Sequence, residues 1–137
     1  MRLNGLSNVR VIRKAAWSHA GLVGWYESQV PLWHKVAPDA TTKIEAVTVD
    51  ELVEQFALPR VDWIKVDVEG GEVEVLRGAW RTLEQFRPVL LIEVHQTLAA
   101  LRTLLEPAGW VFEALVFDEE PPRHGWVRCV HPARQCR

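Results

Sequence analysis

The sequence lacks the features that mark several large classes of protein. No apolar run approaches the roughly 18 residues that a membrane-spanning helix needs. Neither sign of charge dominates, because 16 basic and 18 acidic side chains leave a formal net charge of −2, and the sequence pI is near 6.2. We therefore expect no membrane association and no nucleic-acid partner bound through phosphate neutralisation.

Cysteine is equally scarce. Cys129 and Cys136 are the two cysteines, and they do not form a CxxC pair. Basic residues at positions 10, 13 and 14 interrupt the apolar start of the chain, which is not the pattern of a secretory signal. Reduced thiols and a cytoplasmic location are the expectation.

The chain does have the material for one globular domain. It has 137 residues, of which 48% are hydrophobic, and domains most often contain about 100–150 residues. This apolar content can offset the entropy that ordering the backbone costs, so disorder of the whole chain is excluded. We predict a single domain over residues 1–137.

Strand patterns alternate with helical patterns along the sequence. The predicted strands are residues 9–14, 22–27, 43–49, 61–68, 89–95, 110–117 and 126–131. The predicted helices are a short one with Asp50 as its N-cap, a continuous one over 73–83, and one over 98–108 capped by Thr97. Residues 28–42 are expected to form a loop. The fold class is α/β, with a mostly parallel sheet and a carboxyl-terminal antiparallel hairpin.

Acidic side chains gather where two of these strands end. The first group is Asp67, Glu69 and Glu72, around the turn at Gly70 and Gly71, and the second is Glu93 with His95. Strand alternation predicts that Asp67 is the last inward carboxylate of its strand. Ligands of open parallel sheets bind at this end of the strands, and glycines allow a close approach to the backbone.

Two segments carry a resemblance to a known family. Residues 62–78 (DWIKVDVEGGEVEVLRG) and 87–95 (RPVLLIEVH) resemble the signature of the FkbM-type methyltransferases. In that family a strand ends in a pattern of Asp, Glu, Gly and Glu, and a later strand led by Pro ends in Glu-Xaa-His. Ala15-Ala16-Trp17-Ser18 and Val47 to Asp50 resemble two weaker features, so the likeness covers roughly residues 8–116.

The resemblance implies a class I methyltransferase fold that uses S-adenosylmethionine to methylate a hydroxyl of a small molecule or saccharide. It implies catalytic roles for Asp67, His95 and Glu93. It implies cofactor contacts from Asp67, Glu69, Gly70, Ala15 and Ala16, and acceptor contacts from Glu72, Glu93 and His95. A general base would be needed beside the acceptor, and His95 or a carboxylate of the rim could serve.

The sequence also departs from the family pattern. It contains no glycine-rich loop after a first strand and no acid after a second, the groups that hold this cofactor in such folds. We therefore expect a partial fold, the carboxyl-terminal part of a methyltransferase. The strand over 61–68 would then be an exposed edge that favours self-association. The alternatives are a non-catalytic α/β module of the same ancestry and a Rossmann-like hydrolase using Asp67 and His95.

Three other features are interpreted as structural. Glu93 and His95 lack a third metal ligand at a recognisable spacing, and His124, Cys129 and His131 are taken as incidental, so no metal site is expected. Lys65 is expected in a structural ion pair. The seven tryptophans are expected to pack in the core rather than to stack on a ligand.

Overall fold

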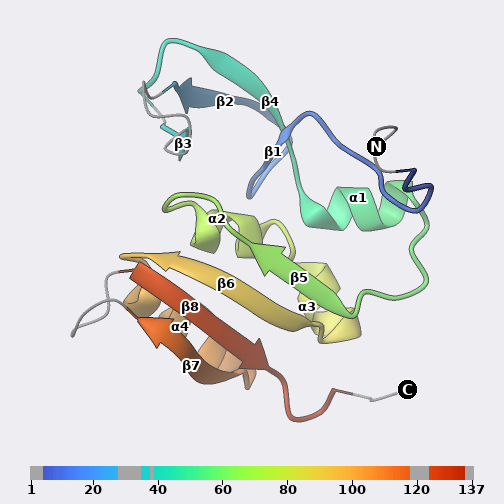
Figure 1. Ribbon diagram of the computed structural model, residues 1–137. Helices are drawn as coiled ribbons and strands as arrows, with labels where there is room; N and C mark the ends of the chain where they lie inside the picture. The colour runs from blue at the N-terminus through green and yellow to red at the C-terminus, as the bar shows by residue number, and fades with distance from the viewer. Residues whose placement is uncertain (1–4, 28–34, 38, 118–123, 135–137) are drawn as a thin grey trace.

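A computed structural model describes residues 5–27, 35–37, 39–117 and 124–134, and it contains two four-stranded sheets (Figure 1). The first sheet has the order β1-β4-β2-β3, with β1 at Ala15–Ala16, β2 at Gly21–Tyr26, β3 at Lys35–Val36 and β4 at Lys43–Val47. The second has the order β5-β6-β8-β7, with β5 at Trp63–Val66, β6 at Val89–His95, β7 at Val111–Phe117 and β8 at His124–Val130.

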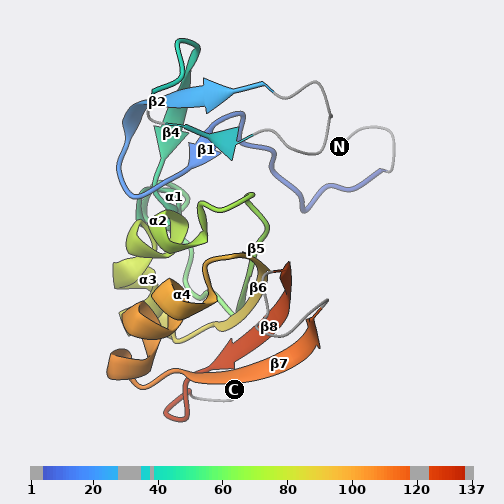
Figure 2. The same cartoon turned by 90° about the vertical axis from the view of Figure 1, so that its left-hand side faces the viewer.

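The helices are short, and most of them pack against the second sheet. They are α1 (Val49–Gln55), α2 (Glu72–Arg77), α3 (Trp80–Phe86) and α4 (Leu98–Leu105), with a 3₁₀ turn at Glu106–Ala108. Figure 2 shows α2, α3 and α4 along one face of the second sheet, whose other face has no helix against it in the described part of the chain. No described helix has the length and apolarity needed to cross a bilayer.

The hydrophobic core lies between this sheet and these helices. Along β6, Leu90, Ile92 and Val94 are fully buried and alternate with half-exposed residues. Leu76 from α2 and Leu101 from α4 are also fully buried in the same cluster. The period-two alternation of β6 therefore directs one of its faces into the core.

The α/β class and the carboxyl-terminal antiparallel hairpin of β7 and β8 are confirmed. The expectation of a mostly parallel sheet is wrong. Parallel pairing occurs between β1 and β4 and between β5 and β6, whereas β2–β3, β2–β4, β6–β8 and β7–β8 are antiparallel. In the second sheet, β6 and β7 run in the same direction, and β8 lies between them and runs in the opposite direction, so it is antiparallel to both.

Two predictions near the amino terminus are corrected. Residues 9–14 form no strand, and the nearest strand is β1 at Ala15–Ala16. The alternating pattern of this segment predicts a strand, but the segment pairs with no strand in the described part of the chain. One of its apolar side chains, Val11, is 60% exposed. The predicted loop over 28–42 contains β3, which pairs with β2; residues 28–34 and 38 of that loop lie outside the described part.

The single helix predicted over 73–83 is two helices in the structure: α2 ends at Gly78, its C-cap, and α3 begins at Trp80. A Cβ at this position would lie 2.0 Å from the carbonyl oxygen of Trp17. The backbone carbonyl of Gly78 also accepts a hydrogen bond from the backbone N–H of Asp50 at 3.0 Å. Gly78 is therefore the point where segments from both halves of the chain meet, and only glycine fits there without a backbone shift.

Asp50 does not cap α1 as predicted. The N-cap is Thr48, which forms a capping box with Glu51. The Asp50 carboxylate instead accepts hydrogen bonds from the backbone N–H groups of Arg81 and Thr82, at 3.0 and 2.8 Å. These groups belong to the first turn of α3, so Asp50 caps a helix about 30 residues further along the chain.

Among the described residues, β5 pairs with β6 alone and forms one edge of its sheet, as the sequence predicts. Trp63 on this strand is 59% exposed. An uncovered edge with an exposed aromatic side chain can pair with another copy of the chain. Self-association itself stays a prediction.

That prediction can be tested by sedimentation velocity over a concentration series. We expect the wild-type chain to associate, and Trp63→Lys to weaken association because a charged side chain at an edge disfavours strand pairing. Leu22→Lys, at a 68% exposed position in the other sheet, is the matched control and should associate like the wild type. A chain that is monomeric at every concentration would contradict the prediction.

Leu76 gives a direct test of the core. Its truncation to alanine should lower the free energy of unfolding by about 2–5 kcal/mol, because it leaves a cavity between α2 and the sheet. Chemical denaturation monitored by circular dichroism measures this. The same truncation at exposed Leu22 should stay within about 0.5 kcal/mol. Equal effects at the two positions would mean that the packed face of α2 is misassigned.

Candidate functional site

The carboxyl ends of β5 and β6 bring the predicted acidic residues together. These strands are parallel neighbours, and Val66 of β5 pairs with Ile92 of β6. The next residues, Asp67 and Glu93, therefore reach the same edge of the sheet. Left-handed backbone at Glu69 (φ 42°) and Gln96 (φ 63°) turns the chain away after each strand.

Asp67 is exposed, so its predicted inward orientation is wrong. The inward positions of β5 are Ile64 and Val66, which pack against the helices, and Asp67 follows the opposite, helix-free face. Lys65 Nζ lies 2.6 Å from Asp67 Oδ2, which confirms the ion pair expected for Lys65. The hydrogen bond from Lys65 is the main reason why the pKa of Asp67 is lowered.

Glu93 has the opposite electrostatic environment. Burial raises the pKa of Glu93, and the neighbouring Asp67 carboxylate raises it further. His124 of β8 approaches from the other side, with its Nε2 atom 3.0 Å from Glu93 Oε1. Two adjacent carboxyl groups thus have pKa values shifted apart, an arrangement that is common where protons are transferred.

Glu72, the second residue after Gly70, is completely buried. Its Oε1 atom accepts the backbone N–H of Gly70 at 3.0 Å and lies 2.7 Å from Nδ1 of His95. Its Oε2 atom accepts the hydroxyl of Thr97 at 2.9 Å. The carboxylate of Glu72 is therefore hydrogen-bonded to three segments: the turn after β5, the end of β6 and the start of α4.

This contact determines which nitrogen of His95 faces outward. An ionised carboxylate only accepts hydrogen bonds, so neutral His95 donates the proton on Nδ1 to Glu72 and carries its lone pair on Nε2. Nε2 lies 3.5 Å from Oε2 of Glu69. Chemically, such a nitrogen can accept a proton or bind a metal ion.

Ala15 and Ala16 reach this region indirectly. They form β1 in the first sheet, where Ala16 pairs with Val47 and packs against the core. The next residue, Trp17, extends to the turn after β5, because a Cβ on Gly71 would lie 2.8 Å from its ring. The sequence reasoning missed Trp17, whose position beside two glycines depends on the packing of the first sheet.

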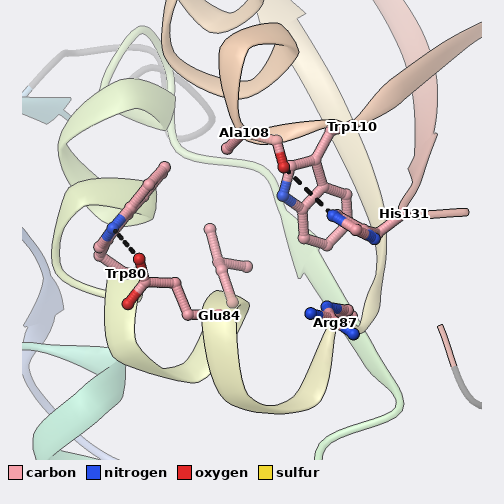
Figure 3. A pocket seen from close by; sticks show the side chains of 7 residues that line it. Trp80, Glu84, Arg87, Ala108, Trp110 and His131 are labelled. Carbon is pink, nitrogen blue, oxygen red and sulfur yellow. Dashed lines mark hydrogen bonds between the residues drawn. The ribbon is translucent and has the colours of Figure 1, made fainter. Parts of the chain in front are cut away.

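A separate pocket lies at the other end of β6. It has a volume of about 350 Å³ and is lined by Trp80, Leu83, Glu84, Arg87, Ala108, Trp110 and His131 (Figure 3). The indole N–H of Trp80 donates to Glu84 at 3.0 Å, and Nε2 of His131 lies 3.1 Å from the carbonyl oxygen of Ala108. β6 is seven residues long, so the pocket is roughly 20 Å from His95 and separate from the acidic edge.

The structure adds one residue to the acidic edge, His124. It stands directly opposite His95 in the antiparallel pair of β6 and β8. Glu93, His95 and His124 each offer one ligand atom, and these atoms lie within 4.8 Å of one another. His124, which the sequence analysis takes as incidental, is therefore a possible third ligand beside Glu93 and His95, whereas the expectation of no metal site stays a prediction. Sequence spacing could not reveal this ligand, because strand pairing across a long connection brings His124 there.

Comparisons with known proteins agree with the resemblance. Residues 15–113 match the methyltransferase FkbM domain. The hexuronic acid methyltransferase AglP of Haloferax volcanii is 40% identical over 62 residues, which cover 45% of this chain and 26% of that protein. No solved structure matches the chain significantly. Because the family match includes both strands of the acidic edge and most of the chain, this protein belongs to the FkbM methyltransferase family.

Proposed function

We propose that this chain forms the acceptor side of an S-adenosylmethionine-dependent methyltransferase that methylates a hydroxyl of a saccharide. Family membership supports methyl transfer, and the similarity to a hexuronic acid methyltransferase supports a saccharide acceptor. The matched segment spans about a quarter of that relative, 26%, so activity and acceptor are both part of the proposal. We also propose a cytoplasmic location.

The observation that carries this proposal is the pair formed by His95 and buried Glu72. Methylation of a hydroxyl requires removal of its proton, and a positioned histidine is a common base for that step. Nε2 of His95 faces the acidic edge with its lone pair, and the proton of the acceptor passes to it. Glu72 acts through His95 and not on the acceptor, because it is completely buried.

The other residues of the edge surround this base. Asp67, exposed and kept ionised by Lys65, suits the ammonium group of an amino-acid-bearing cofactor. Glu69 and Gly70 border the same turn, and Glu93 contacts the acceptor beside His95. We place Ala15 and Ala16 near the cofactor, because the next residue, Trp17, reaches the turn after β5. When bound, S-adenosylmethionine supplies an electrophilic methyl group.

We further propose that the parallel pair β5–β6 with α2 and α4 corresponds to part of a class I methyltransferase fold. In such folds the ligand lies beyond the carboxyl ends of the parallel strands. This is where Asp67, Glu93 and His95 are found. A non-catalytic interaction module of the same ancestry is the second candidate, favoured by the uncovered edge of β5.

Methyl transfer can be measured directly with radiolabelled S-adenosylmethionine and a glucuronic acid glycoside. The donor should be used at high concentration, because the glycine-rich loop of related sites is not found in this sequence and an incomplete site binds weakly. We expect methylation by the wild type and a fall of about 10²–10⁴-fold in His95→Gln, because glutamine cannot accept the proton.

His19→Gln is the control, since His19 is exposed and hydrogen-bonded to its neighbour Ser18. It should methylate at the wild-type rate. No transfer by the wild type would overturn the methyltransferase proposal for this chain and leave the interaction module. Wild-type rates in His95→Gln would instead exclude His95 as the base.

Glu72→Ala tests the proposed positioning role. The change leaves Gly70, His95 and Thr97 without their acceptor, so we expect the free energy of unfolding to fall by about 1–3 kcal/mol. In nitrogen NMR spectra the imidazole of His95 should change from a single Nδ1–H tautomer toward a mixture. Thr97→Ala removes only one of the three donors and should leave the tautomer unchanged. An unaltered tautomer in Glu72→Ala would contradict the role.

A further inference from the structure

Glu93, His95 and His124 form a compact group of three metal-ligating side chains. Glu93 and His95 are two residues apart on β6 and therefore share a face of the sheet. His124 is the residue paired with His95 across β6 and β8, so it lies on the same face. The two imidazole rings have centroids 5.0 Å apart.

We propose that these three residues bind a divalent first-row transition metal ion, of which Zn²⁺ is the representative. Two imidazoles and one carboxylate are the ligand set of open zinc sites, in which a fourth position is left to water or substrate. Mg²⁺ and Ca²⁺ are disfavoured because they prefer oxygen ligands alone.

The surroundings of His95 are those of a metal ligand. A ligating histidine almost always donates its second ring N–H to a carboxylate or carbonyl, which fixes the tautomer. His95 does so at Nδ1, 2.7 Å from buried Glu72. In the neutral tautomer that this hydrogen bond favours, the Nε2 lone pair points away from Glu72 and is available to an ion.

The distances between the three ligand atoms are close to those of a metal site, so small side-chain movements would let all three contact one ion. Ligand atoms bonded to zinc at about 2.0–2.2 Å are roughly 3.4 Å apart in a tetrahedron. Nε2 of His124 and Oε1 of Glu93 are already 3.0 Å apart, and the whole group lies within 4.8 Å. The side chain of His124 is 49% exposed, whereas that of Glu93 is 17% exposed, so an ion can reach the group from the solvent on the His124 side.

The charge of the edge also favours a cation. Asp67 and Glu69 place two further carboxyl groups beside the three ligands, and Lys65 is the cation paired with Asp67 there. A divalent ion would offset this local excess of negative charge. It would also occupy Nε2 of His95, so the metal-bound state and the proton-accepting state of the proposed function exclude each other.

The inference can be tested with the metal alone, so it stands or fails independently of methyl transfer. Titration of the untagged chain with Co²⁺, in a Cys136→Ser background, should produce visible absorption bands that saturate at one ion per chain. Zn²⁺ should displace the Co²⁺ and abolish the bands. Calorimetry with Zn²⁺ provides the affinity of each variant.

Variants separate the site from adventitious binding. Glu72→Gln should weaken binding about 10–100-fold through the orientation of His95, and His124→Asn should weaken it at least as much. His19→Asn and His131→Asn change histidines outside the group and should bind like the wild type. Circular dichroism checks that each variant folds. Absence of binding, or equal affinity in His124→Asn and the wild type, would overturn the proposal.

Discussion

The buried carboxylate of Glu72 is the constraint on which the acidic edge depends. A charge removed from water is tolerated only when it is fully hydrogen-bonded, and this one has donors from Gly70, His95 and Thr97. These residues come from three separate segments, so satisfying Glu72 requires the turn after β5, the end of β6 and the start of α4 to meet. The orientation of His95 is a consequence of this arrangement.

A second junction couples the two sheets. Gly78 lies against the backbone of Trp17. The carboxylate of Asp50 caps α3, and the backbone N–H of Asp50 donates to the carbonyl oxygen of Gly78. The ring of Trp17 then lies against Gly71, in the turn that precedes α2. The first sheet thus contacts both ends of α2, and a change in either glycine would displace the turn that carries the acidic residues.

The sequence was most informative where local signals were strong. Residues 89–95 were predicted as β6 with both bounds correct, because a long apolar alternation follows Pro88 and ends in polar residues. The convergence of Asp67, Glu93 and His95 followed from the rule for parallel strands. Failures came from contacts distant in sequence. The break between α2 and α3 depends on the contact of Gly78 with Trp17. The position of His124 beside His95 depends on the register of β6 and β8, which residue spacing in the sequence does not give.

The acidic edge also limits how an anionic ligand can be presented. Any carboxylate brought to this edge meets like charge, and two such charges about 4 Å apart repel by roughly 4 kcal/mol near a protein surface. Lys65 and Arg128 could offset this, but they are already paired with Asp67 and Glu113. Under the proposed function, an acceptor that carries a carboxylate would therefore turn its hydroxyl toward His95 and its carboxylate toward solvent, so the edge would discriminate by the position of the hydroxyl rather than by the charge of the ligand.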